Sequence, residues 1–270
     1  MTAMCVPIFI KPDLKLEETF DDIDDALEGL GHREGMIELR CDTATPRQML
    51  EAMEFARFPV IITVRPTWEG GQCSKDDEYR IGLWEAAMEA GAEFVDIELL
   101  AWERKINIRE RICEAAEKHG TRIILSTHSF EPGRKDVEGR IARLRRIKQA
   151  DVLKVAFTAE NILDGIEALR LQEKLKREDP RPSLVLAMGA EGVISRLLAR
   201  KFGAAFTFAA ISADQRKKLF ADWLLIQLPP AKSKRNSMRK ICQAFCKKRG
   251  GAVLPEFDLG ETHLWLMLHG

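Results

Sequence analysis

The sequence predicts an α/β protein, a single (β/α)8 TIM barrel with a basic C-terminal extension. Eight short apolar runs recur at roughly 25 to 35 residues, the spacing of one strand, one helix and two loops. The segments between them carry apolar residues at helical spacing among charged ones. The apolar runs are continuous, as is typical of parallel strands that are covered on both faces. Eight repeats favour a closed barrel over an open doubly wound sheet.

The expected elements alternate along the chain in strand–helix order. The strands are the continuous apolar runs 5–10, 36–40, 60–64, 94–99, 123–127, 152–156, 183–188 and 205–210. The helices are the amphipathic segments 14–30, 46–58, 79–90, 106–119, 140–149, 162–177, 193–201 and 214–227. Gly91, Gly120 and Gly203 stand where these helices should end, because glycine readily adopts the left-handed conformation of a helix C-terminus.

The barrel pattern stops near Gln227, where Pro229-Pro230 interrupts it. We therefore expect a catalytic barrel over 1–228 and an extension over 229–270, packed on the barrel or partly flexible. Residues 232–249 contain eight Lys and Arg and no acidic residue, and 237–248 fit a helix. We interpret this helix as covering part of the barrel with a solvated basic face. Aromatic residues are not interleaved with the charges as in many nucleic-acid-binding segments, so nucleic-acid binding is not expected.

Composition excludes several classes of protein. The 270 residues include 42 Lys and Arg and 42 Asp and Glu, so the formal net charge is zero and gives no reason to expect binding to nucleic acid or to a membrane surface. No apolar run reaches the roughly 20 residues that span a bilayer. The N-terminus lacks the basic start and long apolar stretch of a signal peptide. Six cysteines without a Cys-x-x-Cys pair indicate reduced thiols, a cytoplasmic location and no metal site.

A lysine inside an apolar run points to the chemistry. Lys154 lies within Val-Leu-Lys-Val-Ala-Phe (152–157), and His128 ends the preceding apolar run. A charged amine in such a strand costs several kcal/mol unless it is paired or neutral. A neutral lysine is what Schiff-base chemistry with a ketone requires. Taken alone, Lys154 fits an ion pair with Glu38 or Glu98, and His128 fits a hydrogen-bonded core residue.

Several expected strands place ionisable groups at one rim of the barrel. The active site of such a barrel lies at the C-terminal ends of its strands. Glu38 and Arg40 share one side of their strand, where a structural ion pair is the simplest explanation. Burying so many ionisable groups without a ligand would destabilise the fold for no structural return, so the convergence favours an enzyme. The polar groups at this rim are Glu38, Arg40, Asp42, Arg65, Glu69, Asp96, Glu98, His128 and Lys154.

Five segments resemble the type I 3-dehydroquinate dehydratases. They are 37–42 (Ile-Glu-Leu-Arg-Cys-Asp), 63–71 (Thr-Val-Arg-Pro-Thr-Trp-Glu-Gly-Gly), 126–130 (Ser-Thr-His-Ser-Phe), 150–156 (Ala-Asp-Val-Leu-Lys-Val-Ala) and 187–196 (Ala-Met-Gly-Ala-Glu-Gly-Val-Ile-Ser-Arg). Phe202-Gly203 and Thr207-Phe208 follow. The segments occur in the family order over roughly residues 4 to 215. The resemblance implies a (β/α)8 barrel that dehydrates 3-dehydroquinate to 3-dehydroshikimate in the shikimate pathway of aromatic amino acid biosynthesis.

The resemblance also implies a role for each matching residue. Lys154 corresponds to the Schiff-base lysine, His128 to the general base and acid, and Glu69 to the residue that orients the histidine. Three groups correspond to those that hold the ring hydroxyls: Glu38, Arg40 and Arg65. Arg196 corresponds to the arginine that binds the substrate carboxylate. Phe130, Met188 and Phe208 correspond to apolar residues around the ring. No metal or organic cofactor is expected, and the family resemblance suggests a homodimer.

The electrostatics expected of these residues fit the assigned chemistry. A lysine with a pKa of about 10.4 is neutral in only about one molecule in 2,500 at pH 7. We expect burial and the nearby Arg40, Arg65 and Arg196 to depress the pKa of Lys154 and favour the neutral amine. A histidine with an unperturbed pKa near 6.5 can take a proton beside the imine and return it to the departing hydroxyl.

The chain departs from the family pattern after the eighth strand. Where the family carries Ser-Ala-Pro-Gly-Gln, residues 209–215 read Ala-Ala-Ile-Ser-Ala-Asp-Gln, with no Pro-Gly turn and an added acid, Asp214. Ser212 and Gln215 are the expected counterparts of the family's substrate-binding lid residues. A shortened lid leaves two alternatives to the dehydratase. One is a related Schiff-base lyase for another polyhydroxy keto acid, and the other is a weakly active paralogue that binds a ligand.

Overall fold

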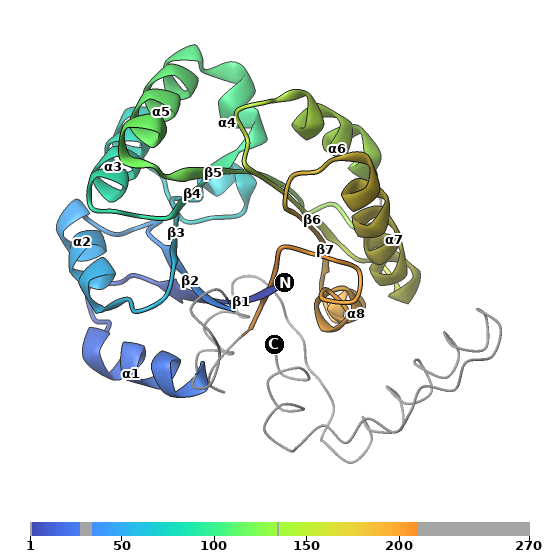
Figure 1. The fold of residues 1–270 in the computed structure, drawn as a ribbon, viewed down its shortest axis with the longest axis horizontal. Coiled ribbons are helices and arrows are strands. Elements are labelled where there is room, and N and C mark those ends of the chain that lie inside the picture. Colours follow the sequence, from blue (N-terminus) through green and yellow to red (C-terminus); the bar gives the residue numbers. More distant parts are fainter. Residues whose placement is uncertain (1, 28–33, 134, 210–270) are drawn as a thin grey trace.

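The structure, a computed structural model, describes residues 2–27, 34–133 and 135–209. Eight strands form one parallel sheet in the order β7-β6-β5-β4-β3-β2-β1-β8. Seven neighbouring pairs carry the parallel ladder, and between β7 and β8 the amide of Ala205 donates to the carbonyl of Ser183 at 2.8 Å. The sheet is therefore a nearly closed barrel, and Figure 1 shows the helices on its outer side. The predicted (β/α)8 fold is confirmed.

The elements follow the predicted order. The strands are β1 (Ala3–Phe9), β2 (Gly35–Arg40), β3 (Val60–Thr63), β4 (Phe94–Glu98), β5 (Arg122–Ser129), β6 (Val152–Thr158), β7 (Ser183–Met188) and β8 (Phe206–Phe208). The helices are α1 (Leu16–Ala26), α2 (Pro46–Phe55), α3 (Asp77–Glu89), α4 (Leu99–Arg104), α5 (Ile106–His119), α6 (Val137–Arg146), α7 (Ile162–Glu178) and α8 (Val193–Leu197), with the 3-10 helix η1 (Thr67–Glu69).

Two elements, η1 and α4, were not predicted. The fourth expected strand, 94–99, ends one residue early because Leu99 begins α4. The expected helix 214–227 and the proposed extension 229–270 lie outside the described residues, so the domain division stays a prediction.

Capping side chains explain where two helices begin. Thr45 and Gln48 form a reciprocal capping box, with Pro46 at the first position of α2. Asn161 and Asp164 form the same arrangement at the start of α7. Each box satisfies backbone N–H groups that the first turn of a helix leaves without a partner. At the other end of α5, Gly120 adopts φ 72°, as expected for a left-handed C-cap.

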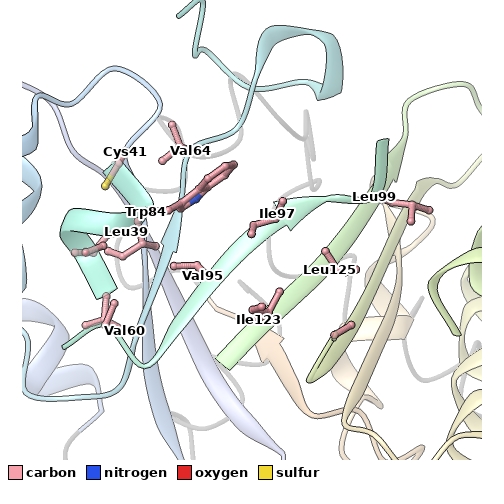
Figure 2. Close-up of a cluster of buried hydrophobic side chains, with 14 of the residues drawn as sticks. Leu39, Cys41, Val60, Val64, Trp84, Val95, Ile97, Leu99, Ile123 and Leu125 are labelled. Atoms are coloured by element: carbon pink, nitrogen blue, oxygen red, sulfur yellow. The ribbon is translucent and has the colours of Figure 1, made fainter. Parts of the chain in front are cut away.

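Alternation along the strands gives the barrel two cores. Leu39, Val95, Ile97 and Leu125 face outward and pack with Trp84 of α3 in the layer between sheet and helices (Figure 2). Residues of opposite parity face inward. At the N-terminal side of the interior these are apolar and include the buried Ile61, Phe94, Ile124 and Val152.

The same inward face becomes polar toward the C-terminal ends of the strands. Thr63, Asp96, Ser126 and Lys154 each lie two residues beyond those apolar positions on β3, β4, β5 and β6. Side chains two residues apart on a strand share one face of the sheet. The polar layer therefore packs directly on the apolar layer, on the side of the C-terminal strand ends.

Two further findings concern the predicted cellular setting. Within the described ranges, none of the helices combines the length and the apolar character that a bilayer crossing requires. Four cysteines fall in the described part of the chain, and all four are free thiols: Cys5, Cys41, Cys73 and Cys113.

Candidate active site

Lys154 projects into the polar layer and is 3% exposed. Its Nζ donates to Asp96 Oδ2 at 2.8 Å and to Glu38 Oε1 at 3.3 Å. The same nitrogen lies 4.9 Å from the centre of the Phe208 ring, which packs edge-on against Phe206. The amine is therefore held between β2, β4 and β8, deep in the barrel.

The ionisation of Lys154 differs from the sequence-based expectation. Burial alone would lower the pKa of its amine, but the carboxylates of Asp96 and Glu38 outweigh burial and raise that pKa above its ordinary value. Arg65 acts in the expected direction and is the weaker influence. The predicted depression was wrong, because two carboxylates bond the amine directly and the sequence did not show which acids would do so.

Arg65 links this amine to a wider ion-pair network. Its guanidinium donates to Asp96 Oδ1 at 2.7 Å, Glu98 Oε1 at 2.8 Å and the Ser126 hydroxyl at 2.9 Å. Glu98 also accepts from Arg80 of α3, whose Nε donates to the carbonyl of Val64. Every charge in this network is buried, and each has an opposite partner, the condition under which buried charges are tolerated.

His128 lies on β5, next to the strand that carries Lys154. Glu69 Oε1 accepts the backbone N–H of His128 at 2.6 Å and lies 3.2 Å from its Nδ1. The ring of Phe130 stacks on the imidazole, with ring centres 6.4 Å apart. This arrangement fixes the imidazole plane and makes Nε2 the ring nitrogen that faces away from Glu69.

The loop that carries Glu69 depends on two glycines. Gly70 adopts φ 74°, and a Cβ there would lie 2.1 Å from the ring of Phe130. A Cβ on Gly71 would lie 2.1 Å from the carbonyl oxygen of Arg65. Only glycine permits both the positive φ and this close approach. The Glu-Gly-Gly string therefore serves to bring Glu69 beneath the imidazole.

Asp42 anchors the same loop. Its carboxylate accepts the backbone N–H groups of Arg65 and Gln72, both at 3.0 Å, and pairs with Arg40 at 2.7 Å. Arg40 in turn lies over the ring of Phe9. The single carboxylate of Asp42 thus binds both Arg40, a predicted site residue, and the loop that follows β3.

Burial sets the ionisation of His128 and Glu69. Burial, together with the positive charges of Arg65 and Lys154, lowers the pKa of His128 well below 6.5. Burial raises the pKa of Glu69 to about 8, against the opposing charge of Arg65. Glu69 Oε2 is also buried and has no hydrogen-bond partner among the described residues. The imidazole is thus neutral near pH 7 and can accept a proton.

We expect Glu69→Gln to flatten the pH dependence of the free energy of unfolding between pH 4.5 and 8, the ordinary and folded pKa values of Glu69. Because the folded pKa is raised, the stability that this group contributes is complete below 4.5 and is lost as the pH rises through 8. Glutamine keeps an acceptor for the His128 N–H but does not titrate. Urea unfolding across this window checks the slope. Glu103→Gln, at an exposed carboxylate of α4, should keep the wild-type slope; a wild-type slope in Glu69→Gln would contradict the assignment.

Arg196 lies on α8, just after β7. Its guanidinium donates to the carbonyls of Ala187 at 2.9 Å and Gly189 at 3.3 Å, and among the described residues it pairs with no carboxylate. Burial lowers its pKa to about 10, so the group stays charged at neutral pH. Ser195 and Thr207 bond backbone carbonyls around it, which fixes the segment. A partly buried arginine that has no acidic partner among the described residues has the chemistry of an anion site.

The other predicted site residues are placed as follows. Phe130 is exposed at the end of β5, Met188 is buried at the end of β7, and Phe208 lies beside the amine. Ser212 and Gln215 lie outside the described residues. The structure thus brings Lys154, Glu38, Arg65 and Phe208 into one linked set and His128, Glu69 and Phe130 into a second set on the neighbouring strand.

Sequence reasoning assigned no role to Asp96 or Arg80, although both belong to the network around Lys154. A signal for Asp96 existed. Asp96 and Glu98 are acidic residues two apart within an apolar strand, a spacing that places both side chains on one face of the sheet. Arg80 lies in a helix among many charged residues, and nothing in its local pattern separates it from a solvated arginine.

Comparison with known proteins identifies relatives of this chain. The family model for type I 3-dehydroquinase matches residues 4–219. A 3-dehydroquinate dehydratase of Methanococcus maripaludis is 31% identical over 208 residues, 77% of this chain and 89% of that protein. A bifunctional 3-dehydroquinate dehydratase/shikimate dehydrogenase of Arabidopsis thaliana is 30% identical over 186 residues, which cover 67% of this chain but 29% of the plant protein.

Solved structures agree in fold. A type I 3-dehydroquinate dehydratase of Clostridium difficile, crystallised with covalently modified comenic acid, superposes with a TM-score of 0.66 at 24% identity over 78% of this chain and 85% of that one. The Enterococcus faecalis 3-dehydroquinate dehydratase gives 0.61 at 25% identity, over 82% of this chain and 93% of that one. With the match of the family model over most of its length, the chain belongs to the type I 3-dehydroquinase family.

Proposed function

We propose that the protein dehydrates 3-dehydroquinate to 3-dehydroshikimate, the shikimate-pathway step, through a Schiff base on Lys154, with His128 as general base and acid. The observation that carries the proposal is the pairing of β5 with β6. Ser126 lies opposite Lys154 and His128 opposite Ala156, so the amine and the imidazole share the inner face of adjacent strands, two residues apart in register. The ring of one small substrate can then contact both the amine that forms the imine and a neutral base.

The reaction divides into capture, elimination and release. The ammonium group of Lys154 passes a proton to the ketone oxygen, its nitrogen then adds to the carbonyl carbon, and loss of water leaves a protonated imine. The positive nitrogen draws electrons from the adjacent carbon and acidifies its proton, which Nε2 of His128 removes to give an enamine. The enamine expels the hydroxyl from the next carbon as the imidazolium returns its proton, and one water departs. Hydrolysis of the conjugated imine then frees the enone and the amine. No metal or organic cofactor enters these steps.

The lowered pKa of His128 suits the first proton transfer, because the imidazole is already neutral when the substrate arrives. Glu69 fixes the ring through Nδ1, so that Nε2 is the nitrogen on the side away from Glu69. The charge of Lys154 and Arg65 works against an imidazolium, which favours rapid return of the proton to the leaving group. The imidazole of His128 therefore acts as a base when neutral and as a strong acid when protonated, within one catalytic cycle.

The predicted hydroxyl-binding residues differ in how freely they can meet a substrate. Glu38 accepts only from Thr63 and Lys154 in the hydrogen bonds described, and Arg40 pairs with Asp42 near the rim. Arg65 is 1% exposed and directs its guanidinium to Asp96, Glu98 and Ser126. We therefore propose direct hydroxyl contacts for Glu38 and Arg40. A direct contact of Arg65 requires the exchange of one of its present partners.

We propose that Arg196 binds the substrate carboxylate and that Phe130, Met188 and Phe208 enclose the ring. Ser212 and Gln215 are the proposed lid contacts to the same carboxylate. Because Arg196 has no acidic partner among the described residues, an incoming carboxylate gains a fork of two N–H donors without displacing another anion.

Arg196→Ala should raise KM by roughly 10- to 100-fold with a smaller change in kcat, the range that hydrogen bonds to a charged group contribute. The measurement is steady-state kinetics of the purified protein. Arg196→Lys should recover only part of the loss, because an ammonium group cannot form the bidentate contact. Arg200→Ala, at an exposed arginine four residues on, is the matched control and should be unchanged. A normal KM in Arg196→Ala would remove the proposed carboxylate site.

The test of the proposed function uses purified protein and 3-dehydroquinate. Enone absorbance should rise with time, and borohydride reduction should add the substrate-derived mass to Lys154. An adduct with other polyhydroxy keto acids but none with 3-dehydroquinate would favour the related lyase. If enone absorbance does not rise and no adduct forms, the proposed enzyme activity is contradicted and the ligand-binding paralogue remains. The cytoplasmic location, the homodimer and the absence of nucleic-acid partners stay predictions.

A further inference from the structure

We propose that Asp96 is a positioning residue of this reaction: its carboxylate fixes Nζ of Lys154 and is the counterion of that nitrogen both before substrate capture and in the imine. The inference rests on the proposed function and adds a residue to which sequence reasoning gave no role. It identifies what keeps a buried nitrogen in one place while its bonds change.

The carboxylate of Asp96 is itself rigidly held. Oδ1 accepts from Arg65 at 2.7 Å and from the Ser126 hydroxyl at 2.5 Å, and Asp96 is fully buried on β4. Oδ2 is the oxygen that meets Nζ of Lys154, at 2.8 Å. Two donors therefore fix one oxygen of the group and direct the other at the amine. This division suits a residue that orients a neighbour and does not itself move.

Glu38 is the other carboxylate near the amine, and its contact is looser. Its Oε1 lies 3.3 Å from Nζ and 2.8 Å from the Thr63 hydroxyl, and no arginine bonds it in the contacts described. Its side chain is also one methylene longer than that of Asp96. Glu38 is thus suited to exchange Nζ for a substrate hydroxyl, whereas Asp96 stays where Arg65 holds it. In this proposal Glu38 binds substrate and Asp96 positions the amine.

The charged and titratable groups near the amine come from four strands and from the segment after a fifth. They are Cys5 on β1, Glu38 on β2, Asp96 on β4, His128 on β5 and, just beyond β3, Arg65. Burial raises the pKa of the Cys5 thiol, which stays uncharged, and His128 is neutral. Arg65 opposes the ammonium charge. Loss of Asp96 would leave Glu38 as the single anion within salt-bridge distance of Nζ among the described residues.

Conservation of charge makes one fixed anion sufficient for both states. An ammonium group and a ketone together give a protonated imine and one water. Of the three N–H protons, two depart with the ketone oxygen and one stays on nitrogen. The nitrogen therefore begins and ends this step with one positive charge and at least one N–H donor. Asp96 Oδ2 can accept that N–H in each state without rearrangement, so the charge needs no new solvation as the bonds change.

The titration of Lys154 tests the inference without substrate. With lysine labelled by ¹⁵N at Nζ and ¹³C at Cε, NMR follows each amine, and Lys154→Met assigns the signal. Asp96→Asn should lower the midpoint of Lys154 by at least about one pH unit, the usual effect of removing an adjacent opposite charge. Asp96→Glu, which keeps the charge, should stay nearer the wild type. Glu103→Gln, at a carboxylate on the outer ring, should leave the midpoint unchanged.

An unchanged midpoint in Asp96→Asn would overturn the role of counterion. If that variant does not fold, the wild type decides: the amine should still be an ammonium at pH 9, and a neutral amine there would overturn the inference. Borohydride trapping with 3-dehydroquinate is scored separately. Trapping by the wild type with no shift in Asp96→Asn contradicts only the role of Asp96, whereas a shift with no trapping by the wild type contradicts only the Schiff base.

Discussion

Lys154→Ala should reduce turnover on the order of 10⁵-fold, to the limit of detection, because no other group can supply the covalent nitrogen. The enone assay measures the rate, and borohydride reduction should no longer add substrate mass to the chain. The alanine also removes the one cation paired with Glu38 among the described residues and one of the two cations paired with Asp96. Part of any loss of stability therefore belongs to those two buried carboxylates.

A charge-matched variant separates these effects. Lys154→Arg keeps a positive group opposite Asp96 and Glu38 but cannot form an imine at neutral pH. It should unfold at a urea concentration closer to that of the wild type than Lys154→Ala does, and remain as inactive. Turnover within tenfold of the wild type in either variant would remove Lys154 from the proposed mechanism.

His128→Ala should lower kcat by roughly 10²- to 10⁴-fold, the usual contribution of a positioned acid or base. Imine formation depends first on the amine, so substrate trapping by borohydride should persist, although more slowly. The histidine variant would then accumulate an adduct that it cannot process. If the variant neither turned over nor trapped substrate, His128 would be required for imine formation itself.

The pH profile gives His128 a second signature. Because burial and nearby cations lower its pKa below 6.5, the imidazole stays a base at pH values where an exposed histidine is already protonated. The acid limb of kcat/KM assigned to this group should therefore lie below pH 6.5, and His128→Ala should lack that limb. A limb at or above 6.5 that persists in the variant would belong to another residue.

The barrel was predictable because its signal repeats. Continuous runs such as 60–64 and 183–188 are covered on both faces, and eight of them at regular spacing admit few architectures. The 3-10 helix at Thr67–Glu69 and the short α4 at Leu99–Arg104 were not predictable from periodicity, because each is too short to show one. Their positions follow instead from tertiary contacts, such as those between Glu69 and His128.

The sequence predicted which residues belong to the candidate site, but it predicted less well which of them form ion pairs with one another. Glu38, His128 and Lys154 stand out as charges in apolar strands, and strand parity places them on one face. Parity does not say which opposite charges meet. Glu98 was one expected partner of Lys154, yet it pairs with Arg65 and Arg80, and Asp96 takes the amine. The direction of the pKa shift of Lys154 depended on that choice, which is why sequence reasoning had it wrong.

The ion pairs inside the barrel also limit how the protein can be altered. One unbroken chain of alternating charge runs from Glu38 in the barrel interior out to Arg80 on α3. Its members, in order, are Glu38, Lys154, Asp96, Arg65, Glu98 and Arg80. A single exchange within this chain removes one opposite partner from each neighbour, so redesign of the site for a new substrate calls for compensating changes made in pairs.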